Sequence, residues 1–136
     1  MQTSLQRMNP ATLPDASKIG YSQISITNAG TLAFVSGQVA QAVDGSSGAP
    51  EGLEAQTKQV ITNLSEALRA LEASAHDIVQ LRIYVMHLDE QAMAIAMPLI
   101  VAFLNGAEPS LTGIGVAALA GPDLKIEIEM IVQLPT

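Results

Sequence analysis

The sequence predicts an α+β domain in which two helices cover one face of a mixed β-sheet. Segments of alternating hydrophobicity and segments of helical periodicity follow one another in the order β-β-α-β-α-β-β. Two helices can shield only one face of such a sheet, so the second face must meet water or another molecule. With 136 residues, the whole chain, 1–136, is expected to form a single domain.

The N-terminal part is expected to be an extended arm followed by a β-hairpin. Residues 1–19 are polar and contain two prolines, which favours the arm. Residues 21–40, "YSQISITNAGTLAFVSGQVA", contain two strand-like runs separated by "NAG". Asn28 and Gly30 tolerate positive φ, so a hairpin turn is predicted between the two runs. Residues 44–52, "DGSSGAPEG", predict the loop before the first helix.

The first helix is predicted over residues 52–74 because apolar side chains recur there at spacings of three and four. Most of the charged side chains fall on the opposite side of the helix. We expect the helix to end near Ser74. The residues predicted to share its buried face are Leu53, Thr57, Val60, Leu64, Leu68 and Leu71.

The second helix is predicted over residues 89–106, with Asp89 as its N-cap. The segment is apolar on nearly every side, so burial on several sides is expected. Pro98 lies inside it, where a proline costs ~3 kcal/mol and favours a kink. Residues 77–88 alternate and predict the strand before this helix, and residues 111–119 and 125–134 predict two strands after it.

The sheet face that the helices leave open is predicted to mix charged and apolar side chains. This mixture is too apolar for water and too charged for an ordinary core. Charged residues make up 14% of the chain, against a usual ~25%, which favours apolar surface covered by a partner subunit. The residues expected on this face are Arg82, Tyr84, Met86, Glu127, Glu129 and Ile131.

Composition argues against several classes of function. The chain has no cysteine, which excludes disulfides, thiol catalysis and thiolate metal sites and fits a cytoplasmic location. Its net charge is −7 and its six Lys and Arg residues form no run, so nucleic acid is not an expected partner. The longest apolar run covers residues 92–104, shorter than the ~20 residues of a membrane-spanning helix, and no membrane association or signal peptide is expected.

Metal-dependent and nucleophilic catalysis are not expected either. His76 and His87 are the two histidines, and no third ligand accompanies them at a metal-binding spacing. Ser36 has no candidate base beside it in the sequence. Residues 113–115, "GIG", lack the strand–GxGxxG–helix context of a nucleotide site.

Four segments of the sequence form a recognisable set: "YSQ" at Tyr21, "FVSGQVA" at Phe34, "QTKQVITNLSEALRALEAS" and "VAALAGPDLKIEIEMI". Together they resemble the RidA/YjgF family, also called the reactive-intermediate deaminase or endoribonuclease L-PSP family. The resemblance covers residues 21–134. It implies a chorismate-mutase-like fold and a homotrimer, in which the sheets form an inner barrel and a small-molecule ligand binds in a cleft between each pair of subunits.

The resemblance also implies a chemistry without a cofactor. Catalytic members of the family hydrolyse enamines and imines derived from amino acids and release a 2-oxo acid and ammonia. An arginine holds the substrate carboxylate as a planar, bidentate partner. A carboxylate orients or activates water at the imine carbon.

Carried over position by position, the family pattern is only partly retained. The catalytic carboxylate corresponds to Glu127, the first Glu of "KIEIE". The arginine of the "P-x-R-S/T" motif corresponds to Leu111, and a position on the second helix that is usually Asn corresponds to Met97. Apolar residues at these two positions favour a ligand that is uncharged or more apolar. The expected ligand-binding residues are Tyr21, Ser36, Gly37, Met97, Leu111 and, through its backbone N–H, Gly113.

The missing arginine leaves the function open. A charge-assisted pair is worth ~1.5–3 kcal/mol, so its loss weakens carboxylate binding roughly 10- to 150-fold. The first hypothesis is a trimer that binds a small imino or oxo compound and is a weak or inactive 2-imino-acid deaminase. The alternative is an active enamine/imine deaminase whose substrate lacks a free carboxylate or is held by Arg82.

Glu127 and Glu129 could instead be interface carboxylates paired with Lys125 or Arg82. A protein-interaction role for the acidic surface is a third hypothesis. The net charge of −7 argues against a ribonuclease.

Overall fold

The computed structural model describes residues 5–45 and 48–135. Residues 1–4 of the expected arm, and Ser46 and Ser47 of the expected loop, lie outside the described residues. The elements in chain order are β1 (Gln6–Met8), β2 (Ile24–Ile26), β3 (Leu32–Val39), α1 (Leu53–Ala70), the short 3₁₀ helix η1 (Ala75–Asp77), β4 (Ile78–Met86), α2 (Glu90–Leu104), β5 (Ser110–Val116) and β6 (Ile126–Gln133).

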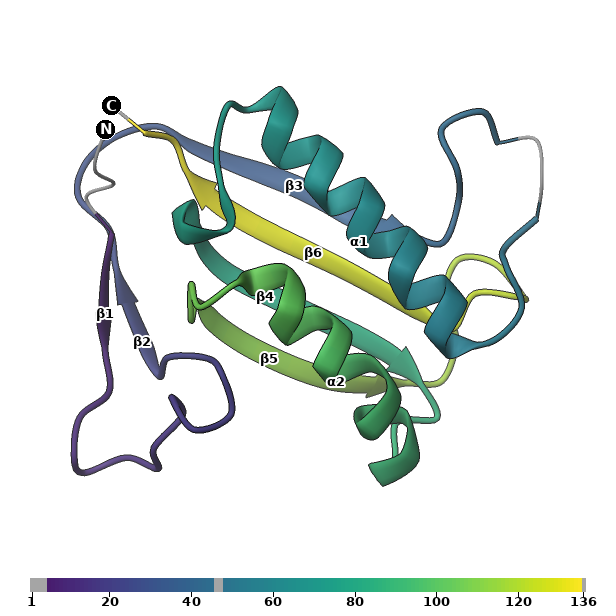
Figure 1. The fold of residues 1–136 in the computed structure, drawn as a ribbon, viewed down its shortest axis with the longest axis horizontal. Coiled ribbons are helices and arrows are strands. Elements are labelled where there is room, and N and C mark those ends of the chain that lie inside the picture. The colour runs from purple at the N-terminus through teal and green to yellow at the C-terminus, as the bar shows by residue number, and fades with distance from the viewer. Residues whose placement is uncertain (1–4, 46–47, 136) are drawn as a thin grey trace.

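The main sheet is mixed, as predicted, with the strand order β3-β6-β4-β5. β4 and β5 run parallel, whereas β6 pairs antiparallel with both β3 and β4. A parallel pair needs a crossover connection, and α2 supplies it between β4 and β5. β1 and β2 form a separate two-stranded sheet at the left of the main sheet, near the start of β5 (Figure 1).

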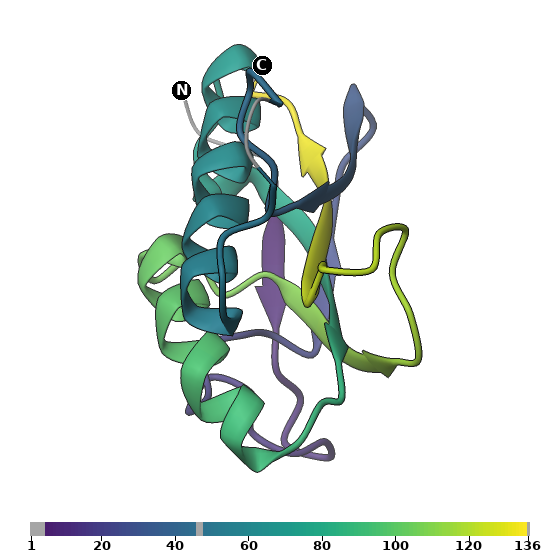
Figure 2. The ribbon, with the colours of Figure 1, turned by 90° about the vertical axis from the view of Figure 1, so that its right-hand side faces the viewer.

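Both α-helices of the described chain lie on one face of the main sheet, as predicted (Figure 2). The strands bury alternate residues against them, because successive side chains of a strand point to opposite faces. On α1, Val60, Leu64 and Leu68 are buried at helical spacing. The sheet residues buried beneath the helices, each at most 3% exposed, are Leu81, Ile83, Val85, Ile126, Ile128, Met130 and Val132.

The N-cap predicted for α2 is confirmed, because the Asp89 carboxylate accepts a hydrogen bond of 2.8 Å from the backbone N–H of Ala92.

The prediction that α2 is buried on several sides is wrong for the single chain. α2 packs on the sheet and α1 with one face only, and Met93 and Val101 stay 41% and 38% exposed. Pro98 lies within this helix. No helix of the described residues has the length and apolar character to cross a membrane.

The hairpin predicted around Asn28 and Gly30 is wrong. β2 pairs with β1, with Gln6 opposite Ile26, while β3 pairs with β6. Turn propensity is local, and here it is outweighed by the burial that β3 gains against β6. The arm is also more ordered than predicted, since its residues Gln6–Met8 form β1.

The first helix ends before its predicted boundary. α1 finishes at Ala70, with Leu71 as its C-cap. Ser74 instead caps η1: its hydroxyl accepts from the backbone N–H of His76 at 3.3 Å, and the Asp77 carboxylate accepts from the backbone N–H of Ser74 at 2.8 Å. This reciprocal pair is a capping box, which starts a new turn where the apolar pattern alone predicted a continued helix.

Candidate functional site

Glu127 lies on the central strand β6, on the sheet face that carries no helix. It is opposite Val39 of β3 and Tyr84 of β4. Beside it, β3 bulges between Val35 and Gln38, a segment that contains Ser36 and Gly37. A β-carbon at Gly37 would lie 2.6 Å from Cδ and 2.8 Å from Cγ of Glu127. The carboxylate therefore occupies the space that any other side chain at position 37 would need.

The two glutamates of β6 have different environments. Glu129 accepts a hydrogen bond from the Tyr84 hydroxyl and lies 3.7 Å from Nη1 of Arg82. Glu127 is half-buried, and within residues 5–45 and 48–135 its carboxylate makes no ion pair or hydrogen bond. The predicted alternative, in which Glu127 pairs with Lys125 or Arg82, is thus not found in the single chain. Of the two glutamates, Glu127 is thus the one without a partner among the described residues.

Tyr84 and Arg82 hold Glu129 in place. The hydrogen bond from Tyr84 to Glu129 raises the pKa of the Tyr84 phenol, with smaller contributions from desolvation and from the negative charge of Glu129, while Arg82 acts in the opposite direction. Arg82 and Glu129, together with Ser36, line a cavity of about 320 Å³ on the open face of the sheet.

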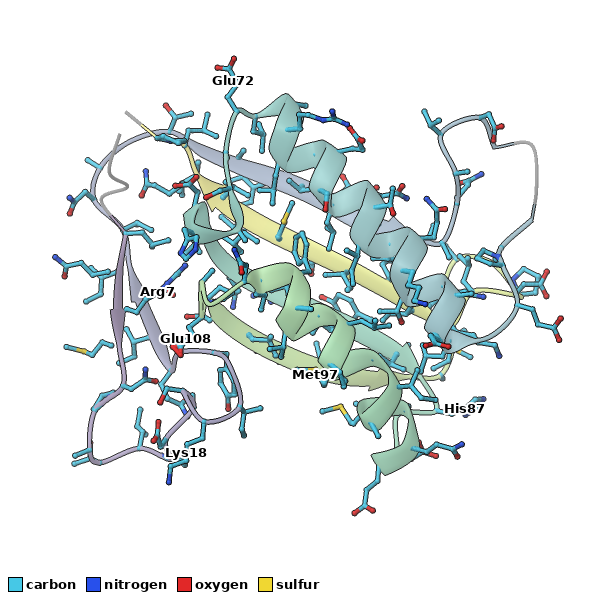
Figure 3. All side chains as sticks on the ribbon, in the orientation of Figure 1. Arg7, Lys18, Glu72, His87, Met97 and Glu108 are labelled. Carbon is cyan, nitrogen blue, oxygen red and sulfur yellow. The ribbon has the colours of Figure 1, made fainter. Side chains whose placement is uncertain are left out.

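A second group of predicted residues lies on the other side of the sheet. Leu111 is opposite Leu81 and Gly113 is opposite Ile83 in the parallel β4–β5 pair, so both face α2. The cavity there measures about 250 Å³. The residues that line it are Ile19, Tyr21, Ile83, Val85, Leu88, Met93, Ala96, Met97, Leu111 and Gly113. Figure 3 shows Met97 projecting from α2.

The chain therefore brings the predicted residues into two separate groups. Glu127, Ser36 and Gly37 form a carboxylate group on the open face, over β3 and β6. The cavity around Leu111, called the apolar pocket from here on, lies on the helix face, over β4 and β5. Because β4 separates β6 from β5, one chain does not place Glu127 beside Leu111.

Arg82 is also remote from Leu111. It pairs with Thr112 of β5 in register, but its side chain points with that of Glu129 to the open face. Any carboxylate that Arg82 holds within its own chain would thus lie on the Glu127 side of the sheet. Arg82 does not occupy the space of the missing arginine in this chain.

The role of Arg7 in anchoring the N-terminal segment is the part of the site that sequence reasoning missed. Arg7 donates hydrogen bonds to the carbonyls of Ala107 (3.2 Å) and His76 (3.3 Å) and to the Ser25 hydroxyl (3.1 Å). The Ser25 hydroxyl is in turn 2.7 Å from that of Ser110, at the start of β5. Figure 3 shows Arg7 extending from β1 toward the main sheet. These contacts anchor β1 and β2, which flank the segment that carries Ile19 and Tyr21, to the start of β5 and to η1.

Burial lowers the pKa of Arg7, an effect that the negative charges of Asp77 and Glu108 oppose. A single arginine in a polar arm carries no sequence signal for this role, because its acceptors are mostly backbone carbonyls. Ile19 was also missed, although an apolar residue next to "GYSQ" could have indicated it. Among the described residues, no three His, Cys, Asp or Glu side chains come together as a metal site.

Comparison with known proteins identifies the family. The model of the endoribonuclease L-PSP family matches residues 13–134. A protein of unknown function of the conserved Rid family, YyfB from Yersinia pestis, is 37% identical, with a TM-score of 0.90 over 97% of this chain and 100% of that chain.

Two further solved structures are more distant. RidA from an Antarctic Psychrobacter is 25% identical, with a TM-score of 0.68 over 97% of this chain and 99% of its own. A member of the YjgF/YER057c/UK114 family from Mycobacterium tuberculosis is also 25% identical, with a TM-score of 0.63 over 96% of this chain and 99% of its own. The α+β fold predicted from the sequence is therefore that of the Rid proteins, and the chain belongs to the endoribonuclease L-PSP, or RidA/YjgF, family.

Proposed function

We propose that this RidA-like protein is a cytoplasmic homotrimer that binds a small imino or oxo compound in clefts between its subunits, and that it is a weak or inactive 2-imino-acid deaminase. The observation that supports the second part is the composition of the apolar pocket. Leu111 stands at the arginine position, and none of the described residues that line the pocket is charged. A substrate carboxylate would find no cation there.

The open face of the sheet supports the assembly. Phe34 of β3 is 73% exposed on this face, opposite Ile131 of β6. In Figure 2 neither helix covers this side of the sheet. Exposed aromatic and aliphatic side chains beside a half-buried carboxylate favour a subunit interface. In such a trimer, the Glu127 group of one chain would meet the apolar pocket of the next, and the two halves would form one cleft.

In this arrangement Glu127 acts as a general base. A water molecule adds its oxygen to the imine carbon while a proton passes to the carboxylate. Both hydrogens of that water end on the nitrogen, which leaves as ammonia while the carbon becomes a carbonyl. A positioned base of this kind contributes about 10²- to 10⁴-fold to the rate. With a 2-imino acid as the substrate, Leu111 offers no compensation for the repulsion between Glu127 and the substrate carboxylate.

A second candidate is an active enamine/imine deaminase with altered specificity. The availability of Glu127, which has no partner in the described chain, favours it. Its substrate would lack a carboxylate, or Arg82 would hold one from the open face. In the second case Arg82 would have to exchange its ion pair with Glu129 for the ligand.

A deaminase assay tests the proposal. Imines are generated in situ from several amino acids, and the rate of their loss is compared for wild type, Leu111→Arg and the uncharged control Leu111→Gln. We expect little activity in wild type and in Leu111→Gln, and a gain in Leu111→Arg that Glu127→Gln abolishes. High wild-type activity on 2-imino acids would contradict the role assigned to Leu111.

The assembly is tested separately by light scattering of the purified protein. We expect the mass of three chains. A monomer at assay concentrations would contradict the cleft model, because the walls of the cleft come from two subunits.

A further inference from the structure

The chemistry of the apolar pocket points to the class of its ligand. Tyr21 alone, of the described residues that line the pocket, has a polar side chain, and its hydroxyl has no hydrogen-bond partner among the described residues. Met93 and Met97, from α2, contribute flexible thioether side chains, which adapt to irregular apolar shapes. The volume of about 250 Å³ lies below the ~300–1,000 Å³ of drug-sized sites, so it suits a metabolite-sized group.

The floor of the pocket leaves room for a ligand beside the backbone. A β-carbon at Gly113 would meet no atom within 4 Å. Gly113 lies on β5, which is the edge strand of the main sheet, and an edge strand presents unpaired backbone N–H and C=O groups on its outer side. A ligand can thus place an apolar group against Met97 and Leu111 and a carbonyl or amide group near the β5 edge and Tyr21.

Within the described residues, Arg7, Lys18 and Arg82 supply no positive charge to this pocket. Arg7 donates to Ser25 of β2, to His76 of η1 and to Ala107 just before β5. Arg82 faces the opposite side of the sheet. Lys18 lies at the outer end of the N-terminal loop and points away from α2 (Figure 3).

The remaining three cations are also elsewhere. Lys58 and Arg69 are on α1, in ion pairs with Glu54 and Glu66. Lys125 lines a different cavity, with His87 and Asp89. All six Lys and Arg residues of the sequence are therefore accounted for.

We infer that the apolar pocket selects an uncharged 2-oxo or 2-imino compound with an aliphatic side chain, such as an amide or ester, over the corresponding free acid. The inference rests on the proposed function in that it concerns the same site. An anionic group in the pocket would lose its hydration without gaining a cation, and the partner's Glu127 would add repulsion. We expect the amide to bind at least ~10-fold more tightly than the acid.

Methionine-methyl NMR tests this selectivity without turnover. The protein is labelled with [methyl-¹³C]methionine, and the signals of Met93 and Met97 are assigned with Met93→Leu and Met97→Leu. 4-Methyl-2-oxopentanamide and 4-methyl-2-oxopentanoate are then titrated separately. We expect the amide to shift the Met93 and Met97 signals at concentrations at which the acid does not, and the signal of exposed Met8 on β1 to stay unchanged with both.

A matched pair of variants reverses the selectivity. Leu111→Arg is expected to bind the acid more tightly than the amide, whereas Leu111→Gln is expected to retain the preference for the amide. Equal or tighter binding of the acid to wild type would overturn the inference, and so would the absence of any shift with either compound.

The outcomes separate this inference from the proposed function. Glu127→Gln should keep the methionine shifts caused by the uncharged amide even where it abolishes turnover, because within its own chain Glu127 does not line the pocket. Equal binding of acid and amide to an intact trimer would overturn the selectivity and leave the assembly and the role of Glu127 standing. A monomer by light scattering that still prefers the amide would overturn the cleft model and leave the selectivity standing.

Discussion

Gly37 of β3 and Glu127 of β6 share one space on the open face of the sheet, because the Glu127 carboxylate fills the position of the side chain that residue 37 lacks. The bulge of β3 places this glycine beside β6. The conformation of the bulge and the position of the candidate base are therefore coupled.

Substitution of Gly37 by Ala is expected to displace the Glu127 carboxylate without unfolding the protein. Gly37 does not have a positive φ, so alanine is compatible with its backbone, and the displaced atoms are the end of a flexible side chain. We expect the free energy of unfolding to stay within ~1 kcal/mol of wild type.

The matching activity test uses the Leu111→Arg background, in which turnover is expected. Added Gly37→Ala should lower turnover toward the level of added Glu127→Gln. Gly48→Ala is the control, since a β-carbon at Gly48 meets nothing within 4 Å. Full activity of the Gly37→Ala protein would show that the position of Glu127 is not critical.

Phe34→Asp is expected to dissociate the proposed trimer. The change places a charge where an aromatic ring is 73% exposed on the open face, and a buried charge without a partner is costly at an interface. Light scattering should report a smaller mass, while circular dichroism should report an unchanged fold. Val43→Asp is the control, because Val43 is fully exposed on the loop between β3 and α1. An unchanged mass for Phe34→Asp would exclude this face from the interface.

The layers of the fold could be predicted from the sequence because buried residues recur at a spacing typical of the helix or the strand that carries them. Leu64 and Leu68 recur at helical spacing, and Ile126 and Ile128 alternate, since each pair faces the same core. The partner of β3 could not be predicted in this way. Phe34 pairs with Ile131, far along the chain, whereas the turn signal at Asn28 acts only locally.

The division of the candidate site into two groups could not be predicted either. Glu127, Leu111 and Gly113 are all predicted site residues, and alternation places Glu127 on the open face, but how close they lie to one another depends on which strands are neighbours. β4 lies between β6 and β5, and no local pattern in the sequence encodes that order. The apolar character of the pocket, in contrast, could be anticipated from Leu111 and Met97 alone.

Arg7→Gln is expected to loosen the N-terminal segment and weaken binding in the apolar pocket. The change removes donors from the partly buried carbonyl of Ala107 and from the exposed carbonyl of His76, and a buried carbonyl left without a partner costs ~1–3 kcal/mol. Hydrogen exchange should become faster in β1 and β2 and stay unchanged in β6. The affinity for the amide, measured by the Met97 signal, should fall.

Lys18→Gln is the matched control for this test, since it removes one exposed positive charge from the same segment. It should leave both exchange and binding as in wild type. Unaltered exchange of β1 in Arg7→Gln would mean that other contacts hold the segment.

The hydrogen bond from Tyr84 to Glu129 predicts a loss of stability at alkaline pH. The pKa of Tyr84 is raised in the folded state, and a tyrosine is neutral when protonated. Its contribution to stability is thus fully present below the unfolded value of about 10 and is lost as the pH rises through the folded value. Above that range the phenolate lies beside the Glu129 carboxylate, and the two negative charges repel each other.

Urea unfolding at a series of alkaline pH values checks this prediction. The free energy of unfolding should fall more steeply with pH in wild type than in Tyr84→Phe. In a Tyr21→Phe background Tyr84 is the single remaining tyrosine, so its ionisation can be followed by absorbance. Glu129→Gln should return the pKa of Tyr84 toward its ordinary value, since it removes the carboxylate that accepts the hydrogen bond and the negative charge that opposes ionisation. Identical pH profiles for wild type and Tyr84→Phe would contradict the coupling, and with it the explanation of why Glu129 is engaged while Glu127 remains available.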